Sequence, residues 1–253
     1  MMGRAVANEF AKMRRLRVTP VVFVMVAGVL AVSCVEFTAS GFVESMGDPA
    51  GKPWQRLLAS MSFSVLMLSP ILLAVLASRQ VDIEHQGNGW LLSRTSGLAP
   101  GYLCRVKFVA AGAVVVAATV AQSGLVFAGG ALVGITVVFP AGQWLGYTAL
   151  LVVVNLVLFA LHLLLSARVE NQLLGMGVGV LGVFFAVIST GLPQWLSHFL
   201  PPWGYYELIK PVEYREDGSL VSLAPSYVSV LALGAAGGVL FLLVTRQFDR
   251  REV

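Results

Sequence analysis

Two polar side chains lie inside a long apolar stretch and are the first candidates for chemistry. Asn155 and His162 are seven residues apart, which places them on one face of a helix. Polar groups are costly to bury among apolar side chains, so the pair either lines a solute path or hydrogen-bonds to a neighbouring helix. A histidine here could also relay protons. We expect the hydrogen-bonding role, because polar residues commonly join helices in this way.

Glu36 is a third candidate, near the end of the first apolar run. It either extends to lipid head groups, which we expect, or meets a cationic solute at the exit of the path. His85 and His198 have no partner at a useful spacing, and neither Cys34 nor Cys104 has a nearby Cys or His. We therefore expect no catalytic residue and no metal site.

A nucleotide-binding loop is missing from the sequence. The pattern G-x-x-x-x-G-K-[ST] cradles the phosphates of ATP, but the only Gly-Lys pair here, Gly51-Lys52, is followed by Pro53. We expect this chain to bind no cofactor. If ATP drives its activity, a separate chain must bind ATP and Mg.

The composition indicates which elements position these residues. Hydrophobic residues make up 57% of the 253 residues and charged residues 12%, against about 25% charged residues in a soluble domain. No charged side chain lies between Lys107 and Arg168, which is room for two membrane spans of roughly 20 residues each. The sequence predicts an all-α membrane protein with six transmembrane helices, at about 18–38, 57–78, 107–130, 144–166, 172–190 and 227–245.

Two further segments are predicted outside the spans. Residues 2–17 should form an N-terminal cytoplasmic amphipathic helix at the membrane interface, because Val6, Phe10 and Met13 recur at helical spacing among basic residues. Between the fifth and sixth spans, an apolar segment interrupted by prolines should form a short, broken re-entrant or interfacial structure. Residues 1–253 should form a single domain.

The basic residues predict the orientation. They are concentrated before the first span, in the connection 79–107 and after the last span, whereas the other side has Lys52, Arg56, Lys210 and Arg215. Both termini and connection 79–107 should therefore be cytoplasmic. The net charge of +4 reflects this distribution, so we expect membrane lipid and no nucleic acid as a partner.

Three bulky residues, Trp90-Leu91-Leu92, lie in the charged connection 79–107. Exposed apolar side chains of this size indicate a contact. They either insert into a groove of a cytoplasmic partner or pack on lipid head groups and on the helix ends of the same chain.

Small residues recur at three- and four-residue steps in the last two spans. This spacing predicts close helix packing and is weak evidence for dimerisation. The residues concerned are Gly175, Gly179, Gly234 and Gly238.

Several motifs in order suggest a family. They are Asn8-Glu9-Phe10-x-Lys12, Glu84-x-x-Gly87-Asn88-x-Trp90-x-Leu92, Lys107, Ser166-Ala167-Arg168-Val169-Glu170-Asn171 and Pro201-Pro202-Trp203-Gly204-Tyr205. Together with the six spans they resemble type-2 ATP-binding-cassette (ABC) transporter permeases, most closely the branch for lantibiotic and bacteriocin immunity.

The resemblance implies a permease in the bacterial plasma membrane that exports an amphipathic peptide or hydrophobic drug, conferring self-immunity or antibiotic resistance. It further implies a dimer with an identical or homologous permease, on two copies of an ABC ATPase that bind ATP and Mg. The residues that would belong to the helix coupled to the ATPase are Glu84, Trp90, Leu91, Leu92 and Arg94.

Two other functions are compatible with the architecture. One is a non-transporting membrane assembly or sensor subunit. The other is an ion-coupled carrier, which is disfavoured because no carboxylate lies in the middle of a span.

Overall fold

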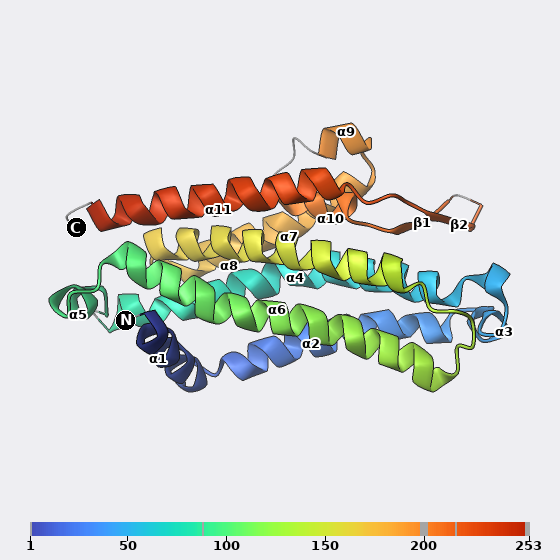
Figure 1. Ribbon diagram of the computed structural model, residues 1–253, viewed down its shortest axis with the longest axis horizontal. Helices are drawn as coiled ribbons and strands as arrows, with labels where there is room; N and C mark the ends of the chain where they lie inside the picture. Colours follow the sequence, from blue (N-terminus) through green and yellow to red (C-terminus); the bar gives the residue numbers. More distant parts are fainter. Residues whose placement is uncertain (1, 88, 198–201, 216, 251–253) are drawn as a thin grey trace.

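The protein is built from long helices that run side by side (Figure 1). The computed structural model describes residues 2–87, 89–197, 202–215 and 217–250. Within them, six helical segments are long and apolar enough to cross a membrane, which confirms the predicted all-α membrane fold. The six helices are α2 (Val18–Cys34), α4 (Pro53–Gln86), α6 (Pro100–Val133), α7 (Ala141–Arg168), α8 (Gln172–Thr190) and α11 (Tyr227–Arg250).

Helices α4 and α6 are longer than the spans predicted from hydropathy. Each has 34 residues, or about 51 Å at 1.5 Å per residue, whereas the hydrocarbon core of a membrane is about 30 Å thick. The apolar window locates only the part within lipid. The helices continue beyond this apolar window. Glu84 therefore lies in the same helix as the second predicted span, and Lys107 lies in the same helix as the third.

Helix α4 lies at the centre of the bundle and packs on α2, α7 and α8. Helix α7 also packs on α6 and α11. Leu57, Leu58, Met61 and Val65 of α4 are fully buried in this core. Helix α11 contributes few buried side chains, so most of its surface faces outward.

One end of the bundle, here called the α5 end, has two short helices in addition to the ends of the long ones. Helix α1 (Met2–Arg15) packs on α2 and α6 and is inclined to the long helices (Figure 1). Helix α5 (Gly89–Thr95) lies beyond the ends of α4 and α6. The final turns of α11 lie at the same end.

The opposite end, here called the hairpin end, contains short elements. They are η1 (Val35–Thr38), α3 (Phe42–Ser45), η2 (Pro49–Gly51), β1 (Val212–Tyr214) and β2 (Leu220–Ser222). Three further short elements follow α8, and the first and last of them lie part-way along the bundle (Figure 1): α9 (Gln194–Ser197), η3 (Pro202–Gly204) and α10 (Tyr205–Leu208). The two strands are antiparallel, with Glu213 opposite Val221.

The broken segment after α8 turns back into the bundle. Element η3 packs on α7 and α8, and α10 packs on the same two helices. As a result Trp203 and Tyr206 are buried. This segment therefore supplies side chains to the interior of the bundle.

Candidate functional site

Four charged side chains form a closed ring at the α5 end. Lys12 Nζ lies 2.9 Å from Glu9 Oε1 and 2.8 Å from Glu84 Oε1. Lys107 Nζ lies 2.8 Å from Glu9 Oε2 and 2.8 Å from Glu84 Oε1. Glu9 and Lys12 come from α1, Glu84 from α4 and Lys107 from α6, so the ring joins three helices.

The charge ring is almost entirely withdrawn from solvent. Lys107 is fully buried, the Glu9 and Glu84 side chains are 3% exposed, and Lys12 is the most accessible member. Burial disfavours the charge of Lys12, but its hydrogen bonds and charge interactions with Glu84 and Glu9 outweigh this effect and raise its pKa. Buried charges are tolerated where each is paired, and here two positive and two negative groups alternate.

Helix α5 rests directly on this ring. A Cβ atom at Gly89, the first residue of α5, would lie 2.9 Å from Glu84 Cα and would also overlap the Glu84 carboxylate. No side chain larger than hydrogen fits there without displacement. The start of α5 is therefore held against the charge ring by backbone packing.

A second link connects α5 to α7 through a histidine. Trp90 Nε1 donates a hydrogen bond to His85 Nδ1 at 3.3 Å, and His85 Nε2 lies 2.9 Å from the Ser166 carbonyl oxygen. Both contacts fit one neutral tautomer, in which Nδ1 accepts and Nε2 donates. Residue spacing indicated no chemical partner for His85, and the structure gives it hydrogen-bond partners from α5 and α7. His198 lies outside the described residues.

Two apolar side chains of α5 face outward. Leu91 and Leu92 are 61% and 63% exposed, whereas Trp90 is partly buried against the bundle. The structure thus divides the Trp90-Leu91-Leu92 motif into one anchoring and two exposed residues. The sequence-based assignment of Glu84 to this helix needs correction, since Glu84 lies in α4. Arg94 lies within α5, but its side chain, like residue Asn88, is outside the described part.

The last turns of α11 are fastened to the start of α6. Arg105 Nη2 pairs with Asp249 Oδ2 at 3.0 Å, and the Tyr102 backbone N–H donates to Asp249 Oδ1 at 3.1 Å. Gly101 lies against the Thr245 carbonyl group, where a Cβ would not fit. Helices α1, α4, α5, α6, α7 and α11 are consequently interconnected at the α5 end.

Asn155 joins three elements in the interior of the bundle. Its Nδ2 donates to Thr119 Oγ1 of α6 at 3.0 Å, and its Oδ1 accepts from the Tyr206 hydroxyl of α10 at 2.8 Å. Asn155 is completely buried. These contacts are those of an interhelical hydrogen bond.

His162 is buried on the same face of α7, two turns along from Asn155, but neither of its ring nitrogens has a hydrogen-bond partner among the described residues, so the expected interhelical hydrogen bond is not made. Its ring lies edge-on to Trp203, with centroids 5.9 Å apart. Trp203 in turn fills the space left by Gly182 of α8. His162 therefore contributes to the contact between α7 and the broken segment.

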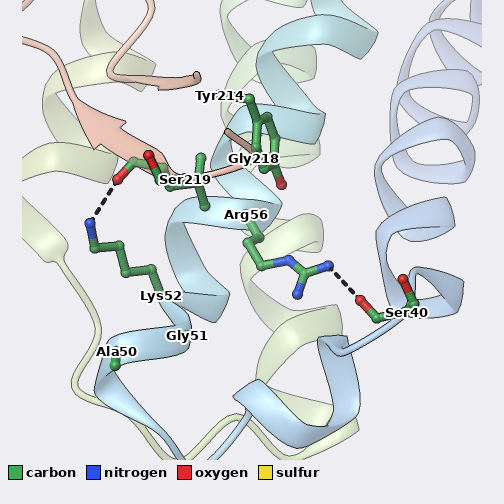
Figure 2. Close-up of a pocket in the computed structure, with 9 residues that line it drawn as sticks. Ser40, Ala50, Gly51, Lys52, Arg56, Tyr214, Gly218 and Ser219 are labelled. Carbon is green, nitrogen blue, oxygen red and sulfur yellow. Dashed lines mark hydrogen bonds between the residues drawn. The ribbon is translucent and has the colours of Figure 1, made fainter. Parts of the chain in front are cut away.

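Glu36 lies at the hairpin end and is paired. Its Oε1 lies 2.7 Å from Arg56 Nε, and both side chains are largely buried. Arg56 also lines a cavity of about 400 Å³ between α4 and the hairpin, in which Lys52 donates to the Leu220 carbonyl oxygen (Figure 2). Glu36 is thus held by an ion pair within the chain.

The predicted packing glycines lie in different surroundings. At Gly179 an added Cβ would lie 2.7 Å from Ala74 Cβ of α4, and at Gly234 it would lie 2.9 Å from Val153 Cγ1 of α7. At Gly175 it would make an ordinary contact with Ser166, and at Gly238 it would meet open space. Gly237, which was not singled out, faces α7 in place of Gly238.

Within the described residues, no group of three or more His, Cys, Asp or Glu side chains is arranged to hold a metal ion. A family model described as "ABC-2 family transporter protein" matches residues 5–187, which run from α1 to near the end of α8. No curated protein matches the chain.

Proposed function

The chain belongs to the ABC-2 family of transporter proteins, whose members are permease components of ABC exporters, and we propose that α5 is the element through which a separate ATPase drives this permease. Membership in the family implies partnership with an ABC ATPase. ATP and Mg are bound by that partner. In this arrangement the α5 end, with both chain termini, faces the cytoplasm, as the distribution of basic residues favours.

The observation that supports this role is the two-sided character of α5. Leu91 and Leu92 are exposed on a helix whose start, by contrast, is tightly packed. Exposed apolar side chains on a short helix suit insertion into a groove of another protein. A helix that only covered the bundle would turn these side chains inward.

Movement of α5 would be passed on by two rigid contacts. Gly89 packs directly against Glu84, which belongs to the charge ring that joins α1, α4 and α6. Trp90 acts on α7 through His85. A partner that binds one position of α5 more tightly than another would shift the whole bundle between two states, since only differential affinity can drive such a change.

The solute that we propose is an amphipathic peptide or a hydrophobic drug, with a role in self-immunity or antibiotic resistance like that of the lantibiotic-immunity branch. We further propose a dimer of permeases, identical or homologous, on two ATPase subunits in a bacterial plasma membrane. The exposed residues of α11 include Val228, Leu231 and Leu243. This apolar surface suits contact with a second permease or with lipid.

The proposal is tested by copurifying the permease with a candidate ATPase in lipid vesicles and measuring solute-dependent ATP hydrolysis. The variant Leu91→Ala/Leu92→Ala should lose ATPase association and turnover. The matched control, Leu132→Ala/Val133→Ala, truncates two exposed residues at the opposite end of the bundle and should retain both. Equal turnover in the two variants would remove α5 from the coupling path. A stable complex without transport would instead favour an assembly or sensor subunit.

A further inference from the structure

A second cavity at the hairpin end has a volume of about 440 Å³, within the range of small-molecule sites. It lies between the first half of α4 and the segment formed by α10 and β1, with η1 and the end of α8 completing its border. Its charged lining residues are Glu36, Glu207, Lys210 and Glu213.

The cavity, here called the amphipathic cavity, has two chemically different walls. Ala59, Phe63 and Leu66 of α4 form an apolar wall. Phe63 is 58% exposed, so this wall is continuous with the outward surface of α4, which lies within a membrane span. An apolar chain could thus extend from lipid into the cavity along Phe63 and Leu66, beside Ser62.

The opposite wall has more carboxylates than cations. Among the lining residues, Glu36, Glu207 and Glu213 are acidic, whereas Lys210 is basic. Lys210 Nζ lies 3.2 Å from Glu207 Oε1 and 3.0 Å from Glu213 Oε1, so two carboxylates share one ammonium group. Glu36 has its own partner, Arg56, which lines the neighbouring cavity.

The state of Glu207 is consistent with incomplete compensation of this charge. Burial raises the pKa of Glu207 even though the Lys210 ammonium opposes that shift. A second cation beside Glu207 would lower the cost of ionising this carboxyl. Lys210 itself demonstrates that an ammonium group fits between the two carboxylates.

The neighbouring cavity of Figure 2 has the opposite character. It shares Tyr214 with the amphipathic cavity, but its charged lining residues are Lys52 and Arg56. In Figure 2, Lys52 reaches toward the hairpin and Arg56 toward Ser40. An anionic head group would therefore favour the neighbouring cavity, whereas the excess of carboxylates in the amphipathic cavity favours cations.

We propose that the amphipathic cavity binds the ammonium head of a cationic amphiphile, whose apolar chain lies along Ala59, Phe63 and Leu66. This inference rests on the proposed export function and assigns the cavity to the release side of the path. The ammonium contacts Glu207 and Glu213 beside Lys210. The occupant is the exported solute, although the ethanolamine head of a lipid presents the same chemistry.

The test is direct binding of a fluorescent dodecylammonium probe to the permease alone in phosphatidylglycerol nanodiscs, without ATPase. After subtraction of the binding to protein-free nanodiscs of the same lipid, the ammonium probe should bind at least about tenfold more tightly than dodecyl sulfate measured by displacement. Glu213→Gln should weaken binding of the ammonium probe several-fold, whereas the control Glu44→Gln, an exposed acid at the same end, should not. Equal affinity for both probes, or equal effects of both variants, would overturn the proposal.

A second variant gives an effect of the opposite sign. Lys210→Met removes the ammonium group that competes with the probe, so it should tighten binding of dodecylammonium. A merely structural role of Lys210 would weaken binding or leave it unchanged, and either result would count against the site. Loss of probe binding in phosphatidylethanolamine nanodiscs would reassign the cavity to a lipid head group.

Failure of this inference is distinguishable from failure of the proposed function. If the probe does not bind while the Leu91→Ala/Leu92→Ala variant loses ATPase coupling, the amphipathic cavity is not a solute site but the exporter assignment stands. If the probe binds with the stated selectivity while no ATPase associates, the cavity stands and the coupling role of α5 fails.

Discussion

The Glu84 carboxylate lies 2.8 Å from the Lys107 ammonium in the buried charge ring, and it also supports the first residue of α5. One side chain thus belongs to the contact that joins the long helices and to the base of the exposed helix. Changes at this position should affect both the stability of the bundle and its coupling to a partner.

Removing one cation from the ring should be costly. Lys107→Met leaves Glu9 and Glu84 with Lys12 alone, and breaking a buried ion pair typically costs roughly 3–5 kcal/mol. Thermal unfolding in detergent should show a large decrease in Tm. The control Arg246→Met removes an exposed cation and should change Tm little. Similar decreases for both variants would indicate that the ring contributes no more than a surface charge.

Gly89→Ala should displace α5. The added Cβ overlaps Glu84, and overpacking of this kind costs about 1–3 kcal/mol. We expect faster proteolysis in the 87–99 connection and reduced ATPase coupling. Gly177→Ala, in a helix position with open space, serves as the comparison and should behave as wild type. Unchanged proteolysis of Gly89→Ala would show that α5 is not seated on Glu84.

The indole N–H of Trp90 should contribute separately from its ring. Trp90→Phe retains an aromatic ring beside His85 but loses the hydrogen bond to Nδ1, at a cost of roughly 0.5–1.5 kcal/mol. Trp90→Ala also loses the packing and should reduce ATPase coupling further. Identical ATPase rates for the wild type and both variants would exclude the link through His85.

The contact between Asn155 and Tyr206 should behave as a structural pair. Asn155→Ala and Tyr206→Phe each remove one end of the 2.8 Å hydrogen bond. A double-mutant cycle on the free energy of unfolding should give a coupling of about 0.6 kcal/mol, typical of bonds between membrane helices. Additive losses of stability, combined with a change in solute affinity, would instead place Asn155 on the solute path.

The raised pKa of Glu207 predicts a pH-dependent stability difference. Its folded pKa exceeds the ordinary value of 4.5, so the folded state favours the protonated form, and this contribution is lost as pH rises through the folded pKa. Glu207→Gln should therefore be more stable than wild type at neutral pH, by an amount that decreases as pH falls through the folded pKa and has vanished below pH 4.5. Thermal unfolding across this range checks the sign. A variant that is less stable at neutral pH would show that the Lys210 pair outweighs burial.

The sequence by itself determined the membrane fold, because a hydrocarbon layer requires apolar segments of defined length and this requirement acts locally along the chain. It also identified Gly179 and Gly234, since small residues at helical spacing are a local signal. The Trp90-Leu91-Leu92 motif was visible for the same reason. Its division into an anchor and an exposed pair was not, because the direction of each side chain depends on what α5 packs against.

Only the tertiary structure decided which charges meet. Glu9, Glu84 and Lys107 are far apart in the chain, and their pairing depends on how α1, α4 and α6 are aligned. His85 likewise finds its partner at Ser166 through helix packing. Strands of three residues are too short for a periodic pattern, so the two strands of the hairpin that borders the amphipathic cavity could not be predicted from residue spacing. Ion pairs and cavities formed by residues distant in sequence depend on the distances between packed helices, and composition and spacing do not encode those distances.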